Sequence, residues 1–130
     1  PVVYAYAIRL AKILGKKFTI YSAYRSEEYN SKLDGSAKKS QHMAGLALDI
    51  ARSSLGDPEK FIVAASREGF TGIGTYNGFI HIDRRSTGRS YWTIASGANR
   101  HEDLLQKHKA GSFVTAKPVP PAIASYDRNV

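Results

Sequence analysis

Two short segments alternate aliphatic side chains with small or polar ones, and this alternation restricts the possible folds more than any other feature of the chain. In "AGLALDIA" the leucines and the isoleucine fall on one face of a strand, and Ala47 and Asp49 fall on the other. In "FIHID" the two isoleucines share one face, and Phe79, His81 and Asp83 share the other. Each segment therefore predicts a strand with one aliphatic face and one face that presents ionisable groups.

The segments before the first of these strands predict a helix, a strand and a second helix. Apolar residues at helical spacing predict a helix over residues 2–14, with Gly15 as its stop. The β-forming residues of "FTIYSAY" predict a strand over about 18–24. Ser26 is a suitable N-cap for a short helix through "EEYNSKL", and "DGSAKKS" predicts a polar loop.

The second half of the chain predicts a helix, a hairpin and a late helix. Asp57 is placed to cap a helix that has Pro58 at its first position and ends at Gly69. The Asn-Gly turn at 76–78 joins two short extended pieces, the second of which is "FIHID". Beyond this hairpin the pattern weakens, although "NRHEDLLQKHK" is compatible with a helix.

Composition sets the size of the domain and excludes several classes of site. The chain has 130 residues and is 42% hydrophobic, enough for one domain with a core that needs no disulfide or structural metal. We expect the domain over residues 1–110, and an extended tail or linker over 111–130, where prolines and small residues accumulate. The absence of cysteine excludes thiolate zinc sites, iron–sulfur clusters and disulfides. Because a core of this size needs no structural metal, a metal bound to this chain would serve function rather than stability.

The chain is strongly basic, with a formal net charge of +8. Such an excess favours anionic partners, of which nucleic acid, anionic lipid and cell-wall polymer are the main classes. Lysines and arginines are spread along the chain, and there is no zinc-finger spacing or RNA-binding aromatic motif. No apolar run approaches the length of a membrane span. We therefore expect a solvated basic surface, with neither a nucleic-acid partner nor membrane insertion.

Three residues could form a metal site if the two alternating strands are neighbours in one sheet. His42 lies just before the first strand, Asp49 lies within it, and His81 lies within the second. Two imidazoles and a carboxylate, with a fourth position left to water, are the ligands of a catalytic zinc ion, which suits amide hydrolysis. Taken singly, however, each residue is more often structural: a histidine satisfied in the core, or an aspartate that caps a turn.

Three segments, "SAYRS", "SQHMAGLALDI" and "GIGTYNGFIHID", together resemble the family of zinc D,D-peptidases and endolysin peptidases. The chain is most similar to the phage and bacterial cell-wall members, and the similarity runs from about residue 18 to 85. The motif Ser-x-His-x-x-Gly-x-Ala-x-Asp is matched in full by Ser40, His42, Gly45, Ala47 and Asp49.

This resemblance implies a fold, a cofactor and an activity. The fold would be a small α+β fold of the hedgehog and D,D-peptidase type, in which an antiparallel sheet carries the site and helices pack on one side. Zn²⁺ would be bound by His42, Asp49 and His81. The activity would be hydrolysis of peptide bonds in peptidoglycan stems or cross-links, as a carboxypeptidase or an endopeptidase. The implied location is extracytoplasmic (periplasm or cell wall) or a phage virion or lysis system, with the tail joining the domain to a virion or a larger parent protein.

The resemblance also suggests residues that contact the substrate. Arg25 falls at the family's substrate site, where its guanidinium could hold a carboxylate or the oxyanion; alternatively it pairs with a nearby carboxylate. Ser40 could orient His42 and face the substrate, or it could simply end the loop. Tyr76, at the hairpin, is the best aromatic candidate for the rim of a groove, whereas Tyr24 and Trp92 are expected in the core.

The chain departs from the family at the general base. Many members place an acid three residues before the last zinc histidine, and others place a histidine two residues before it; here these positions hold Gly78 and Phe79. We therefore expect Asp83 to act as the base or as a partner that orients His81, unless it only pairs with a nearby arginine such as Arg85.

Two other functions are also compatible with the sequence. Loss of the usual base could leave a zinc-containing module that binds the cell wall without cutting it. A basic adaptor that touches nucleic acid or a phage structural protein is a weaker alternative.

The chain has two further histidines, His101 and His108. They lie seven residues apart on the late helix and are expected on the surface.

Overall fold

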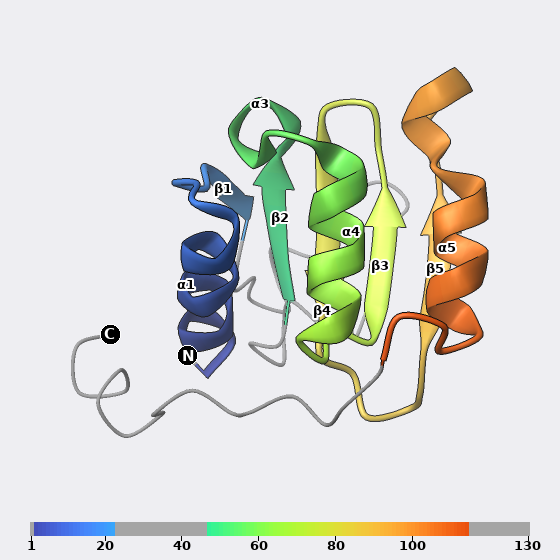
Figure 1. Ribbon diagram of the computed structural model, residues 1–130. Coiled ribbons are helices and arrows are strands. Elements are labelled where there is room, and N and C mark those ends of the chain that lie inside the picture. Colours follow the sequence, from blue (N-terminus) through green and yellow to red (C-terminus); the bar gives the residue numbers. More distant parts are fainter. Residues whose placement is uncertain (1, 23–46, 115–130) are drawn as a thin grey trace, which may run out of the picture.

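The computed structural model describes residues 2–22 and 47–114, which form an α+β fold around one five-stranded sheet (Figure 1). The strands are β1 (Ile20–Ser22), β2 (Ala47–Ala51), β3 (Gly72–Thr75), β4 (Phe79–Asp83) and β5 (Ser90–Thr93). The helices are α1 (Val2–Leu14), α3 (Arg52–Leu55), α4 (Pro58–Arg67) and α5 (Glu102–Lys109), and the 3-10 turn η1 (Gly97–Arg100) precedes α5.

The expected α+β fold is present, but its sheet is mixed rather than antiparallel throughout. The strand order is β1-β2-β4-β3-β5, and the pairs β1–β2, β2–β4 and β3–β4 are antiparallel. β5 is parallel to β3, because residues 84–89 carry the chain from the end of β4 past β3 to the edge of the sheet. Helices α1, α4 and α5 pack on the same face, as expected (Figure 1). We call the opposite face, turned away from these helices, the far face.

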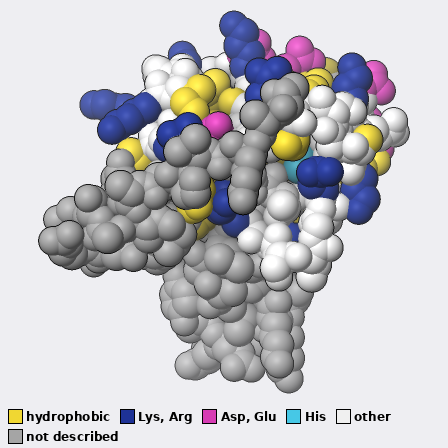
Figure 2. All heavy atoms as spheres, turned by 60° about the horizontal axis from the view of Figure 1, so that its bottom comes forward, with side chains coloured by type: hydrophobic (Ala, Val, Ile, Leu, Met, Phe, Trp, Pro, Cys, Tyr) yellow, Lys and Arg dark blue, Asp and Glu magenta, His cyan; other side chains and the backbone are white. Residues whose placement is uncertain are grey.

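On the face seen in Figure 2, the described basic side chains do not form one tract. Figure 2 shows lysines and arginines at many separate places on the face in view. None of the helices in the described part of the chain combines the length and the hydropathy that crossing a membrane requires.

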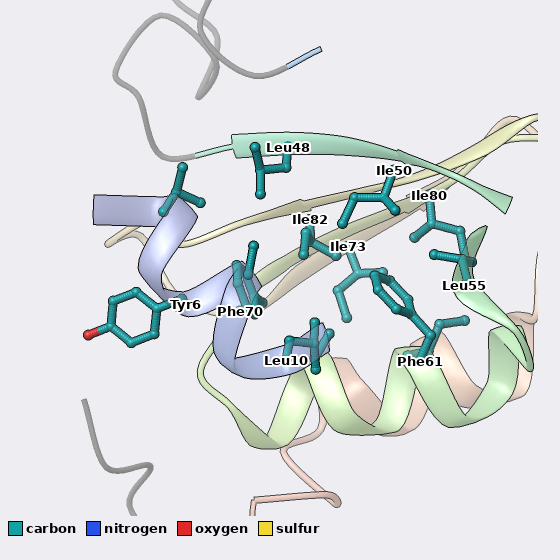
Figure 3. Close-up of a cluster of buried hydrophobic side chains, with 14 of the residues drawn as sticks. Tyr6, Leu10, Leu48, Ile50, Leu55, Phe61, Phe70, Ile73, Ile80 and Ile82 are labelled. Carbon is teal, nitrogen blue, oxygen red and sulfur yellow. The ribbon is translucent and has the colours of Figure 1, made fainter. Parts of the chain in front are cut away.

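The core lies between the sheet and the helices, and the alternation of β2 and β4 creates it. Leu48 and Ile50 from β2 and Ile80 and Ile82 from β4 are fully buried and point toward the helix layer (Figure 3). They pack in one cluster with apolar side chains of the helices, among them Phe61 of α4. The aliphatic faces predicted from the sequence are therefore confirmed.

The two main helices begin and end where their sequence signals lie. The predicted helix over 2–14 is α1. Asp57 caps α4, because its Oδ1 accepts the backbone N–H of Glu59 at 2.9 Å, and Pro58 is the first helical residue. Gly69, just past the end of α4, has φ +90°, a conformation that glycine adopts without strain. The short helix α3 has no counterpart among the predictions.

Some expected elements lie wholly or partly outside the described residues. The strand expected over about 18–24 is β1 over Ile20–Ser22: residues 18 and 19 precede the strand, and residues 23 and 24 lie outside the described residues. The helix capped by Ser26 and the loop "DGSAKKS" belong to the segments that are not described. Of the tail expected over 111–130, only residues 111–114 are described.

His108 is buried, which corrects the expectation that it lies on the surface. Its side chain is 0% exposed. Its Nδ1 lies 2.7 Å from the Ser66 hydroxyl of α4, and its Nε2 lies 2.8 Å from the Thr71 carbonyl oxygen. Because that carbonyl can only accept, Nε2 carries the proton and Nδ1 accepts from Ser66. The apolar spacing of α5 turns this histidine inward, and two hydrogen bonds satisfy it there. His101, by contrast, stays partly exposed at the start of α5.

Burial of His108 makes the stability of the fold depend on pH. Burial lowers the pKa of His108 below its ordinary value, so the unfolded chain takes up a proton before the folded one. The free energy of unfolding should therefore fall as pH drops through about 6.5, the pKa of an unperturbed histidine. We expect urea denaturation at pH 7.5 and 5.5 to show a larger acid-induced loss for the natural chain than for His108→Gln, which cannot titrate there. An equal loss in both proteins would contradict this account.

Candidate functional site

The pairing of β2 with β4 places Asp49 and His81 opposite each other on the far face. The two strands are antiparallel, and Asp49 and His81 are register partners. Nδ1 of His81 lies 2.9 Å from Oδ1 of Asp49. Gly74 of β3 is the next register partner of His81, and Trp92 of β5 follows it. A single row across four strands therefore runs from a carboxylate through an imidazole to an indole.

Asp83 holds the other nitrogen of the same imidazole. Its Oδ2 lies 2.7 Å from Nε2 of His81. Asp83 is fully buried, and Arg85 pairs with it: Nε of Arg85 donates to Oδ1 at 2.9 Å, and Nη2 donates to Oδ2 at 2.7 Å. The site is thus a continuous chain of contacts, Asp49–His81–Asp83–Arg85.

Two glycines of β3 make room for these side chains. A Cβ on Gly72 would lie 2.2 Å from Oδ1 of Asp83, and a Cβ on Gly74 would lie 2.3 Å from the ring of Trp92. Neither glycine has a positive φ, so the need is for space rather than for an unusual backbone conformation. The two glycines at alternate positions of β3 therefore leave the space that the side chains of Asp83 and Trp92 occupy.

The charges of the site stabilise one another. Burial alone would lower the pKa of His81, but hydrogen bonds and attraction from Asp49 and Asp83 outweigh it and raise that pKa. Burial alone would likewise raise the pKa of Asp83, but hydrogen bonds from Arg85 and His81 hold it far below its ordinary value. Asp83 is therefore an ionised carboxylate at neutral pH and can only accept hydrogen bonds.

Aromatic side chains border the imidazole. The ring of Trp92 lies 4.9 Å from that of His81, and Nε1 of Trp92 donates to the hydroxyl of Tyr76 at 2.9 Å. Tyr76 stacks on Phe79 with ring centroids 4.3 Å apart. Trp92 is thus a half-buried part of the site rather than a core residue as expected. The sequence contained its signal, the β-forming run "SYWT", but a strand there was not predicted.

The structure brings together part of the predicted set. Asp49, His81, Asp83 and Tyr76 lie in one neighbourhood of the far face, joined through Trp92. The other predicted site residues, Arg25, Ser40 and His42, lie outside the described residues, as does Tyr24. Within residues 2–22 and 47–114, no three His, Cys, Asp or Glu side chains are grouped so that they could hold a metal ion.

Comparison with known proteins identifies the family. No curated protein matches the chain. The family model described as Peptidase M15 matches residues 6–83, a stretch that includes Asp49, His81 and Asp83 and spans more than half of the 130 residues. The chain therefore belongs to the Peptidase M15 family.

Proposed function

We propose that this peptidase is a zinc enzyme that hydrolyses peptide bonds in peptidoglycan. Membership of the Peptidase M15 family supports the reaction class. The observation that carries the proposal further is the register of β2 and β4, which sets a carboxylate oxygen and an imidazole nitrogen 2.9 Å apart on the far face.

The donor atoms of this pair fit a zinc ion. Zinc accepts imidazole nitrogen and carboxylate oxygen, and two such ligands at about 2.0–2.1 Å in a tetrahedral arrangement lie about 3.3 Å apart. Nδ1 of His81 and Oδ1 of Asp49 need to separate by only a few tenths of an ångström to reach that spacing. His42, from the motif that also contains Asp49, would supply the third ligand. Zinc, when bound, would lower the pKa of a water molecule and polarise the scissile carbonyl.

Asp83 fits the role of orienting partner better than that of base. It is fully buried, and its two oxygens accept from Arg85 and His81. A carboxylate on the far nitrogen of a ligating histidine fixes the orientation of the ring and raises its basicity. Asp83 therefore leaves Nδ1 of His81 directed at Asp49.

The substrate would be held by residues around this centre. Tyr76 lies beside Trp92 and Phe79 at the edge of the site, and Arg25 and Ser40 complete the proposed substrate contacts. The net charge of +8 suits a cell wall rich in carboxylates. Such a substrate places the enzyme outside the cytoplasm or in a phage lysis system.

The test is mass spectrometry of muropeptides released from purified sacculi, with and without a chelator. We expect new fragments that disappear with chelator and return with added Zn²⁺, and their masses would name the bond that is cut. If protein loaded with zinc released nothing from walls of several chemotypes, the proposal would fail. A module that binds the wall without cutting it, motivated by Gly78 and Phe79 at the positions of the usual base, would then be the better account.

A further inference from the structure

We propose that Arg85 is a positioning residue of this site, which orients His81 by fixing Asp83 and Trp92 on two sides of the imidazole. The inference rests on the proposed function, because its consequence is the affinity of the site for zinc. Asp83 contacts the imidazole of His81 directly, and Arg85 is the side chain that holds Asp83 in place.

The grip of Arg85 on Asp83 is bidentate. Nε and Nη2 of Arg85 donate to the two different oxygens of the carboxylate, at 2.9 and 2.7 Å. The backbone N–H of Arg85 also donates to Oδ1, at 3.2 Å. Two parallel bonds from a planar fork fix the plane of a carboxylate, which a single donor cannot do. The plane of Asp83 in turn sets the direction from which Oδ2 meets Nε2 of His81.

Arg85 also contacts the second neighbour of the imidazole. Its guanidinium carbon lies 5.2 Å from the centroid of the Trp92 ring, within the range of a cation–π contact. The Trp92 ring lies 4.9 Å from that of His81. Arg85 therefore contacts both neighbours of the His81 imidazole: Asp83, which bonds to its Nε2, and Trp92, whose ring lies beside it.

The neighbouring arginine provides a matched control, because alternation continues past the end of β4. Arg84 points to the helix side, where its guanidinium lies 3.5 Å from the centroid of the Tyr6 ring and Nη1 donates to the Glu68 carbonyl oxygen at 2.8 Å. Loss of Arg84 should therefore weaken packing between the sheet and the helices without touching the site. The two arginines separate a general loss of stability from a loss of positioning.

The experiment measures the zinc dissociation constant of the full chain by competition with a chelating dye, alongside urea denaturation. Arg85→Gln should weaken zinc binding by about tenfold, the low end of the loss that removal of a ligand's own partner causes, because Arg85 acts through that partner, Asp83. Arg84→Gln should lower the free energy of unfolding and leave zinc affinity unchanged. In an Asp83→Asn background, Arg85→Gln should have little further effect on zinc affinity, because Arg85 acts through Asp83.

The outcomes separate this inference from the proposed function. Unchanged zinc affinity in Arg85→Gln, or an equal loss in Arg84→Gln, would overturn the role of Arg85 while the zinc site stands. A natural chain that binds no zinc would overturn the proposed function, and the role of Arg85 with it. If Arg85→Gln fails to fold, Arg85→Lys decides: it keeps the charge without the fork, so a zinc affinity equal to that of the natural chain would overturn the inference.

Discussion

Replacing His81 by alanine is expected to reduce peptidase activity by more than about a hundredfold. Loss of a residue behind a metal ligand typically costs about 10–100-fold, and loss of a ligand itself should cost more. The same change also leaves Asp49 and Asp83 without the imidazole that lies between them. The measurement is the initial rate of muropeptide release from sacculi at saturating zinc.

His101→Asn is the matched control for this prediction. It also removes an imidazole, but from the start of α5, where His101 contacts Arg52 rather than the site. Asparagine tolerates the positive φ of +53° at that position. We expect this variant to keep the rate of the natural chain. A His81→Ala protein that is folded and as active as the natural chain would show that His81 takes no part in the reaction.

Replacing Gly72 by alanine is expected to damage both the stability of the fold and the site. A glycine within a strand is ordinarily a weak point, and alanine there tends to improve stability. Here the new Cβ would lie 2.2 Å from a carboxylate oxygen of Asp83, which His81 and Arg85 hold in place. Overpacking of this kind costs about 1–3 kcal/mol. Because Asp83 has to move, activity should fall by about tenfold or more as well.

Gly78→Ala separates this clash from the general effect of replacing a glycine. Gly78 lies in the hairpin turn, has no heavy atom within 4 Å of an added Cβ, and has no positive φ. Its replacement should change the free energy of unfolding by less than about 0.5 kcal/mol. Urea denaturation and the rate of muropeptide release would be measured for both variants. If the Gly72→Ala protein were as stable and as active as the natural chain, Asp83 would not be held as tightly as its contacts indicate.

The strand faces could be predicted from the sequence because a period of two is a local property. The alternation correctly places Ile80 and Ile82 against the helices (Figure 3), and His81, between them in the sequence, beside Asp49 on the far face. The start of α4 was equally local, since Asp57 and Pro58 act within one turn of the helix. Features of this kind need no knowledge of distant contacts.

Register and the pairing of distant segments could not be predicted in the same way. Alternation places Asp49 on a face, but only the pairing of β2 with β4 sets it opposite His81. β5 is only four residues long, and although "SYWT" is rich in β-forming residues, its polar and aromatic residues do not alternate as they would in a half-buried strand. Its place beside β3 depends on the path of residues 84–89, and for that reason the role of Trp92 was missed.

His108 shows the limit of treating polar residues one at a time. Lys107 and Lys109 lie on both sides of it in the chain, and such a charged stretch is typical of an exposed helix. The structure buries it because Ser66 and Thr71, which are distant in the sequence, satisfy both ring nitrogens. A buried polar group needs partners, and partners from other elements become visible only when the elements are packed.

The most direct test of the account is the zinc content of the purified full chain after dialysis, compared with that of Asp49→Ala. Asp49 and His81, which the pairing of β2 and β4 brings together, are the two described ligands of the proposed zinc site. The account predicts one zinc ion per natural chain and a large loss in Asp49→Ala, with the fold retained by circular dichroism. One zinc ion retained per chain by a folded Asp49→Ala protein would contradict it.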